Sequence, residues 1–516
     1  MEEYVLDALV ASVESVVPGL GGLAGMLAGL VSGLTGPGAA GLPLAEIEEQ
    51  VTAGGRELLR ACLQHVLDVQ AAAEVRLPGV AGADGVRRTR AERGHARTVV
   101  TTLGAVKVRR IAYRAGARGV PALFPRDAVL NLPQRGYSWR LQQLAVMFAQ
   151  CGSYEQAGEF VRAATGVTIG KRQLEQLTAE TAADAPGFYP GLARDREPQP
   201  AQPLVPLVLS ADGKGVAMRP EARRRRGAKP PGQRVQNFEK RRGTGEKGHK
   251  RIAGTGCVFD ARPPHGPPRT PEQIMSRAPG EPARGPQAVS RWYTVDITAS
   301  HAETISTLFD QGERRDPGHT RPWVALVDGD RHQIDAFRAQ AAARGIDLPI
   351  VVDFIHVLEY LWKAAWCFHA ARDPAIETWV TAQGLDILHG RVSQVISRIR
   401  QLTADNPPAP GSEHDKIIRK TLTYLENKAP YLDYPQALAA GWPIATGVIE
   451  GACRHLVNDR MGITGARWSV EGAQAILWLR AIRANGDLPA YWTHRMEQEH
   501  HRNHLSRYQD SLALAA

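Results

Sequence analysis

Five short apolar segments between residues 205 and 352 constrain the fold of this chain more than any other feature. They lie at 205–211, 251–259, 292–298, 323–327 and 349–352, and each has the length and apolar content of a buried β-strand. Helical patterns separate the last three, at 301–309 and from residue 335 onward. This order of strands and helices predicts one mixed sheet whose first three strands are consecutive hairpins.

The order is that of an RNase H-like core, an α/β fold with a mixed five-stranded sheet. In such a sheet the first and fourth strands are neighbours. The loops after the first and second strands, 213–250 and 261–290, are long, and loops of this length are commonly functional or disordered. The first loop is strongly basic, and its cations include Arg223, Arg224, Arg225, Arg226, Lys240, Arg241 and Arg242.

Two aspartates occupy equivalent places in this pattern. Asp212 and Asp328 each follow an apolar run and precede a glycine. A carboxylate at the carboxyl end of a buried strand faces the crevice in which α/β proteins bind ligands. Paired carboxylates repel each other unless a cation lies between them, and Mg²⁺ prefers oxygen ligands. Taken alone, Asp212 could instead cap a turn after its strand.

A helix predicted at 446–461 supplies a third carboxylate. Its apolar residues recur at helical spacing, so one face can pack on the sheet. Glu450, Arg454 and Asn458 then share the adjoining edge at spacings of i, i+4 and i+8. Glu450 can therefore overhang the two aspartates, and Arg454 is placed to meet a phosphate.

Three further polar residues lie near these carboxylates in the sequence. Asp330 competes with Asp328 as a ligand, although it can also cap the helix that follows. Asp353 comes directly after the last predicted strand, and His356 lies one helical turn later. This pair either supports the active site or forms a buried polar helix start.

The region before residue 186 is predicted to be mainly helical, with a β-hairpin at 97–113. Helices at 137–184 surround a glycine-containing turn, which indicates a helix-turn-helix or an ordinary helical bundle. In the helix-turn-helix interpretation, Lys171 and Arg172 at the start of the third helix contact DNA.

The elements predict a division of the chain into segments. These are 1–93, a helical or flexible arm; 94–185, a β-hairpin plus helix-turn-helix-like DNA-binding region; 186–203, a proline-rich linker; 204–356, the first part of the core; 357–440, a helical insertion; 441–487, the core helix with Glu450; and 488–516, a helical tail. The tail has histidines and glutamates at zinc-ligand spacing, but a solvated terminal helix is the simpler interpretation.

Composition indicates which class of partner the protein binds and in which cellular compartment it lies. The net charge of +10 and a pI near 9.5 favour polyanions, nucleic acid first, although ribosome-associated and membrane-surface proteins share this balance. The five cysteines are scattered without a CxxC spacing, which argues for a reducing compartment. The uncharged stretch at 16–45 is broken by prolines and follows acidic residues, unlike a signal peptide. We therefore expect a cytoplasmic, nucleoid-associated protein without a membrane segment.

The chain resembles the DDE transposases of bacterial insertion sequences, specifically the ISKra-type group, from about residue 94 to 487. The late motif block is specific, whereas isolated Asp-Gly pairs are not. Asp353 and His356 are also similar to the Asp-x-x-His motif of Mutator-like transposases. The matching residues are Tyr137-Ser138, Gly152-Ser153-Tyr154, Asp212-Gly213-Lys214-Gly215-Val216, Asp328-Gly329-Asp330, Asp353-Phe354-Ile355-His356, the block from Gly447 to His455, and Arg460-Met461-Gly462 leading to Gly465-Ala466-Arg467-Trp468.

The resemblance implies an RNase H-like core in which Asp212, Asp328 and Glu450 hold catalytic Mg²⁺, with Mn²⁺ as a substitute. It implies double-stranded DNA as the partner, both inverted-repeat ends and target, bound by a homodimer or a larger assembly. The implied chemistry is two-metal phosphoryl transfer without a covalent protein–DNA intermediate. The helical insertion accounts for the long spacing between Asp328 and Glu450.

In this interpretation Arg454 and Arg467 contact phosphate, and the basic loop holds the DNA backbone without sequence preference. Trp468 is expected to pack rather than to stack on a base. Two other functions stay open. One is a metal-dependent nuclease or resolvase that cuts without strand transfer. The other is a transposase-derived DNA-binding protein that needs no metal, against which the presence of every expected ligand argues.

Overall fold

The computed structural model describes residues 20–195, 205–220, 250–264, 268–276, 285–370, 372–463 and 465–509. The chain divides into two compact units, one made of Met1–Asp184 with Pro489–Ala516 and the other of Ala185–Leu488. The arginines and lysines of the basic loop, Arg223 to Arg226, Lys240, Arg241 and Arg242, lie outside the described residues.

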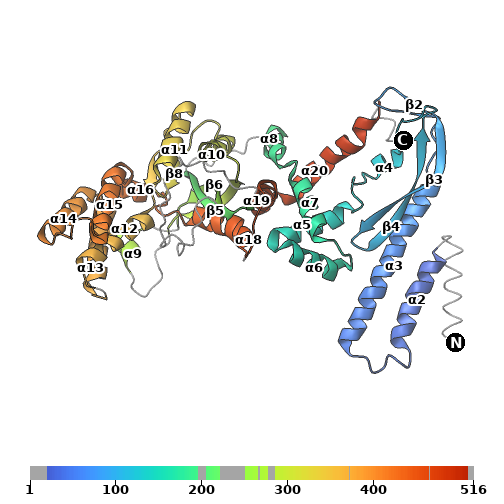
Figure 1. The fold of residues 1–516 in the computed structure, drawn as a ribbon, viewed down its shortest axis with the longest axis horizontal. Coiled ribbons are helices and arrows are strands. Elements are labelled where there is room, and N and C mark those ends of the chain that lie inside the picture. Colours follow the sequence, from blue (N-terminus) through green and yellow to red (C-terminus); the bar gives the residue numbers. More distant parts are fainter. Residues whose placement is uncertain are drawn as a thin grey trace, which may run out of the picture. The chain divides into compact units, whose positions relative to one another are not determined.

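The first unit is built on a long helix and a twisted hairpin (Figure 1). Helix α2 (Gly21–Thr35) precedes α3 (Leu44–Ala72), which packs against the antiparallel pair β3 (Arg90–Thr101) and β4 (Gly104–Arg114). Inward-facing valines of the hairpin form a core cluster with leucines of α3. The hairpin predicted around Gly104 is confirmed, and this glycine has a φ of 122° that favours glycine. Two short strands, β1 (Val80–Ala81) and β2 (Arg87–Arg88), form a separate pair.

Four further helices follow the hairpin in the first unit: α4 (Pro125–Val129), α5 (Trp139–Cys151), α6 (Tyr154–Thr165) and α7 (Lys171–Ala182). Ser153 caps α6 with a reciprocal capping box, and Gly166 ends it in the left-handed conformation. The C-terminal helix α20 (Leu488–Asn503) belongs to this unit from Pro489 on.

The second unit contains a mixed five-stranded sheet in the order β7-β6-β5-β8-β9. Strands β5 (Leu207–Ala217), β6 (Lys250–Arg262) and β7 (Gln287–Asp296) are antiparallel neighbours, whereas β8 (Trp323–Val327) and β9 (Ile350–Val352) extend the sheet in parallel from β5. The second unit therefore has the predicted α/β core, and β8 is buried along its whole length, as expected of a central parallel strand.

Helices cover both faces of this sheet. Helix α10 (His301–Arg315) packs against β6 so closely that a Cβ on Gly256 would lie 2.6 Å from Leu308 Cδ2. Helix α11 (Arg331–Arg344) packs beside α10 and leads from β8 to β9. Because side chains alternate along a strand, Thr255 and its partner Asp212 point to the opposite face, where the late helices lie.

The helical insertion comprises α12 (Phe354–Phe368), α13 (Ala375–Leu388), α14 (Val392–Asp405), α15 (Glu413–Lys428) and α16 (Tyr434–Ala439) (Figure 1). The break predicted at 406–411 separates α14 from α15. The insertion leaves and rejoins the core at one place, because the Phe354 N–H donates to the Ile444 carbonyl at 2.8 Å. A helix far along the chain is thereby returned to the end of β9.

The late helix is not one continuous α-helix. Helix α17 (Gly447–Ala452) passes into a π-helical turn at Cys453–Asn458 and then α18 (Asp459–Met461), before α19 (Val470–Ala484). The wider π turn alters the predicted i, i+4, i+8 spacing after Glu450. Glu450, Arg454 and Asn458 are nevertheless all exposed, while Ile449, Cys453 and Leu456 are buried. Such turns are frequent at functional sites.

Two other sequence expectations differ from the structure. Strand β5 does not end at Asp212 but continues to Ala217, because β6 pairs with it along that whole length. Residues 213–217, predicted as the start of the basic loop, are therefore strand. The segment 186–203, predicted as a linker, begins with helix α8 (Ala185–Asp195). Phe188 of this helix is buried, and Tyr189 packs edge-on against Trp292, which gives the segment an apolar anchor despite its prolines.

Helices of the length and hydropathy needed to cross a membrane are absent from the described residues.

Candidate active site

Asp212 in β5 and Asp328, the residue that follows β8, lie at matching positions. Parallel pairing of β5 with β8 places Ser210 opposite Leu326, and each aspartate follows two residues later. The Ser210 hydroxyl donates to the Leu326 carbonyl at 2.6 Å and joins the strands at this point. Pairing of β5 with β8 stops there, so both carboxylates stand where the two strands diverge.

The two carboxylates interact electrostatically. Burial raises the pKa of Asp328, and the negative charge of Asp212 raises it further, against a backbone hydrogen bond that lowers it. That bond comes from the Asp330 N–H, which donates to Asp328 Oδ1 at 2.8 Å. Asp212 Oδ1 accepts from the Gly213 N–H at 2.6 Å. Each carboxylate thus keeps one oxygen that is not used in these bonds.

Glu450 is held near the end of β9 by a threonine. The Thr446 hydroxyl lies 3.0 Å from Glu450 Oε1 and also bonds to Asp353 Oδ2. One hydroxyl carries one proton, so Thr446 can donate to only one of these carboxylates at a time. Thr446 and Asp353 are both buried, while Glu450 is exposed. The two buried side chains therefore support the exposed Glu450 carboxylate and limit its movement.

Asp353 is the most enclosed carboxylate of this group. Its Oδ1 accepts from the Ile355 N–H at 2.8 Å, and Oδ2 interacts with His356 Nδ1 at 2.9 Å. Burial alone would raise the pKa of Asp353, but the bonds from His356 and Thr446 outweigh it and lower the pKa. The hydrogen bond to Asp353 in turn raises the pKa of His356, with a smaller contribution from the charge of Asp328.

One cluster among the described residues has ligand atoms close enough to share a metal ion. Single ligand atoms of Asp353, His356 and Glu450 lie within 4.8 Å of one another. Asp212 and Asp328 are not part of that group, but His356 connects it electrostatically to Asp328. The structure thus divides the predicted residues into two groups, Glu450 with Asp353 and His356, and Asp328 with Asp212, which interact through His356 and Asp328.

The remaining sequence candidates are placed as follows. Asp330 caps α11 by accepting from the Gln333 N–H at 3.1 Å, which is the alternative role foreseen for it. Arg454 and Arg467 are exposed, as are Lys171 and Arg172 in the first turn of α7. Trp468 is buried under the Arg460 guanidinium, in agreement with the packing role predicted for it.

Thr446 and Cys453 also belong to this site, although no pattern in the sequence marks them. Thr446 was assigned only to a helix start, and nothing in a single threonine signals a bridge between carboxylates. Cys453 is buried within hydrogen-bonding reach of Asp212, and burial with the nearby Asp212 charge raises the pKa of its thiol to about 12. The thiol is therefore protonated and ties the π-helical turn to β5.

The histidine-rich tail forms neither a zinc cluster among the described residues nor a solvated helix. His500 and His504 bond to the carbonyl oxygens of Ala128 and Leu132 at 2.9 and 2.8 Å. Tyr491 and Trp492 of the same helix are buried. The expectation of a solvated tail is therefore wrong, because aromatic residues anchor α20 within the first unit.

We expect Thr446→Val to destabilise the second unit by about 1–2 kcal/mol, because buried Asp353 loses a donor while the shape of the side chain is kept. Thr446→Ser, which keeps the hydroxyl, should stay within about 0.5 kcal/mol of wild type by the same reasoning. Urea unfolding of the three proteins measures this difference. Equal midpoints for Val and Ser would mean that the hydroxyl contributes nothing to the fold.

No protein-family model matches the chain, and no curated protein matches it in sequence. The solved structure described as "Drosophila P element transposase strand transfer complex" aligns with a TM-score of 0.23 and 9% identity, over 71% of this chain and 81% of that one. A likeness this low establishes neither the fold nor the activity of this chain.

Proposed function

We propose that the protein is a DNA transposase of the ISKra type that cuts DNA at the ends of an insertion sequence and joins them to a target. One observation carries the proposal: Asp212 and Asp328 stand side by side where two parallel strands diverge, and the helix with Glu450 lies on the face to which Asp212 points. This arrangement suits phosphoryl transfer at three carboxylates.

The strand order supports an RNase H-like core for this proposal. The antiparallel strands β7, β6 and β5 followed by parallel β8 and β9 have the first strand beside the fourth, as the predicted fold requires. The helical insertion between β9 and α17 accounts for the distance in sequence between Asp328 and Glu450.

The donor set fits divalent metal ions, Mg²⁺ first and Mn²⁺ as a substitute. Asp328 and Asp212 repel each other, so a cation bound between them would offset their electrostatic repulsion in the folded protein. Asp212, Asp328 and Glu450 would hold the ions, and Asp353 with Thr446 would orient His356 and Glu450 beside them. When bound, the ions would supply activation of the attacking oxygen and stabilisation of the leaving oxygen.

DNA binding is assigned to both units. In the first unit, Lys171 and Arg172 begin α7, where a helix N-terminus and two exposed cations suit a DNA backbone or groove. In the second unit, exposed Arg454 and Arg467 and the basic loop would contact phosphates. We propose a homodimer or larger assembly, since two element ends must be processed together.

The test uses duplex DNA taken from both sides of the coding sequence, together with a supercoiled target plasmid and Mg²⁺. Strand cleavage at the ends and covalent joining to the plasmid, both lost in EDTA, are the expected results. Cleavage without joined products would support the nuclease or resolvase alternative instead. Specific binding of the end DNA with no cleavage in Mg²⁺ or Mn²⁺ would leave only the DNA-binding alternative.

A further inference from the structure

A tyrosine hydroxyl without a partner lies beside the carboxylates. The Tyr424 hydroxyl oxygen in α15 is buried, and no group of the described residues forms a hydrogen bond with it. Buried hydroxyl groups in proteins usually have partners, so a hydroxyl without one can still form a hydrogen bond with a ligand. Sequence analysis did not identify Tyr424, which lies in the helical insertion.

Tyr424 reaches the turn that follows Asp328. A Cβ built on Gly329 would lie 3.2 Å from the Tyr424 hydroxyl oxygen and 3.6 Å from Lys428 Cε. Gly329 has a φ of 97°, which favours glycine, and the absence of a side chain there leaves room for both groups. Tyr424 and Lys428 are one turn apart on α15, so they approach the same turn from the same side of the helix.

The ring of Tyr424 is fixed in place. It stacks on Tyr360 of α12 with centroids 3.9 Å apart and an interplanar angle of 13°. Leu425, its neighbour in α15, is fully buried, and α15 packs along α12, which begins directly after Asp353. The hydroxyl is therefore held by the same helix pair that positions His356, and little ordering remains to be done when a ligand arrives.

Each of the two side chains offers a hydrogen-bond donor. Burial raises the pKa of Tyr424, and the nearby carboxylates of Asp328 and Asp353 raise it further, so the phenol keeps its proton. Burial lowers the pKa of Lys428, while the charges of Asp330 and Asp328 favour its ammonium form. A neutral O–H and an ammonium group beside metal-binding carboxylates suit an anionic oxygen that approaches the metal ions. In a DNA-cleaving site that anion is a backbone phosphate.

We propose that Tyr424 and Lys428 bind the non-bridging oxygens of a DNA backbone phosphate next to Asp328. The inference rests on the proposed function, because it assumes that DNA enters this edge of the sheet. It adds to that function a phosphate-binding pair supplied by the helical insertion, which gives the insertion a part in substrate binding.

The test is Tyr424→Phe, which removes only the hydroxyl, assayed by single-turnover cleavage of the flanking duplex DNA in Mg²⁺. We expect the cleavage rate to fall about 10- to 100-fold, as for loss of one hydrogen bond to a charged group. The unfolding midpoint should not change, because the hydroxyl has no partner to lose. Tyr360→Phe removes a hydroxyl from the other ring of the same stack and should cleave within about twofold of wild type, too small a change for a lost hydrogen bond.

A second measurement separates phosphate binding from a structural role. Duplexes with single methylphosphonate groups lack one charged oxygen at a chosen position. At one position next to the cut, the substitution should slow wild type but not slow Tyr424→Phe any further. Lys428→Gln should behave in the same way.

The outcomes distinguish the two proposals. Cleavage by Tyr424→Phe at the wild-type rate, while Asp328→Asn is inactive, overturns the phosphate-binding role and leaves the proposed function intact. A lowered unfolding midpoint in Tyr424→Phe, with additive effects at every methylphosphonate position, also overturns it. A wild-type protein that does not cut DNA overturns both.

Discussion

Asp328→Asn is expected to lower metal-dependent DNA cleavage by at least about 1000-fold, equivalent to about 4 kcal/mol of transition-state stabilisation. The same variant should unfold at a higher temperature than wild type when divalent metal is absent. Loss of activity with a gain of stability is unusual for a strand-end residue. It follows from the position of Asp328 beside Asp212.

The direction of the stability change follows from the pKa of Asp328. Burial and the Asp212 charge raise this pKa, so folding favours the protonated carboxyl. The stability that Asp328 contributes is therefore complete below the pKa of an unfolded aspartate and is lost as the pH rises through the raised value. At neutral pH the ionised group destabilises the fold, and asparagine removes that charge while it can still accept from the Asp330 N–H.

Thermal unfolding with and without Mg²⁺, together with the cleavage assay, measures both effects. Mg²⁺ should raise the wild-type midpoint because it binds only the folded state, and should raise that of Asp328→Asn much less. Asp330→Asn is the matched comparison, since asparagine also caps helices well and should keep cleavage. If Asp330→Asn were inactive and Asp328→Asn active, the ligand would be Asp330.

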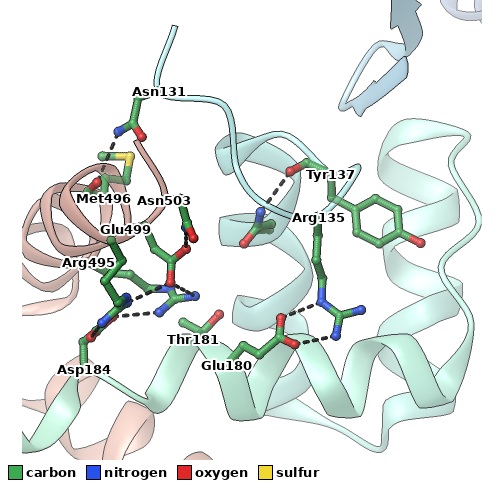
Figure 2. A network of polar contacts seen from close by, with 12 residues as sticks. Asn131, Arg135, Tyr137, Glu180, Thr181, Asp184, Arg495, Met496, Glu499 and Asn503 are labelled. Atoms are coloured by element: carbon green, nitrogen blue, oxygen red, sulfur yellow. Dashed lines mark hydrogen bonds and ion pairs between the residues drawn. The ribbon is translucent and has the colours of Figure 1, made fainter. Parts of the chain in front are cut away.

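Asp184→Ala should destabilise the first unit by about 3 kcal/mol, because it removes the closer of the two carboxylates that pair with buried Arg495 and leaves only Glu499, at 3.6 Å. Asp184 accepts from Arg495 at 2.8 Å and from Arg502 at 2.6 and 2.9 Å. Figure 2 shows Asp184, just after the end of α7, facing Arg495 of α20. The side chains of Arg495 and Asp184 are only 5% and 7% exposed. Removing the carboxylate should therefore release α20 from the helices it joins.

The same pair predicts sensitivity to acid. Burial alone would raise the pKa of Asp184, but the bonds and charges of Arg502 and Arg495 outweigh it and hold the pKa below its ordinary value. The stability from this carboxylate is therefore present above the ordinary aspartate pKa and is lost as the pH falls through the lowered one. Between neutral and low pH, Asp184→Ala should therefore lose less unfolding free energy than wild type does.

Urea unfolding measures the loss of stability, and amide hydrogen exchange in α20 measures whether this helix is released. Glu180→Ala is the matched control, because Glu180 also pairs with an arginine, Arg135, in the same view (Figure 2). The side chains of that pair are 35% and 45% exposed, so its loss should cost less than about 1 kcal/mol. Equal destabilisation by the two variants would mean that burial does not increase the contribution of the Asp184 ion pairs to stability.

Local sequence patterns were sufficient to predict most helices and strands of this chain. The apolar run 323–327 coincides with β8, since a central parallel strand is buried on both faces and needs no partner-specific signal. Asp330 and Ser153 act as helix caps, as local hydrogen bonding allowed them to. Strand β5 was placed too short, because its extension beyond Asp212 depends on pairing with β6 across a long loop.

The residues of the candidate site also include some that local patterns predict and some that they do not. An apolar run before the carboxylate and a glycine after it made Asp212 and Asp328 candidates from the chain alone, and helical spacing made Glu450 a third. Thr446, Cys453 and Tyr424 carry no such signal, because their roles come from residues far away in sequence. Thr446 acts through Asp353, Cys453 through Asp212, and Tyr424 through the turn at Gly329.

The sequence by itself determined the kinds of most elements and their order, because these depend on periodicity and local hydrogen bonding. Only the tertiary structure decided how the insertion returns to β9, how the Thr446 hydroxyl links Glu450 to Asp353, and that α20 packs in the first unit. Those features depend on burial and charge pairing between distant segments, which no local pattern contains.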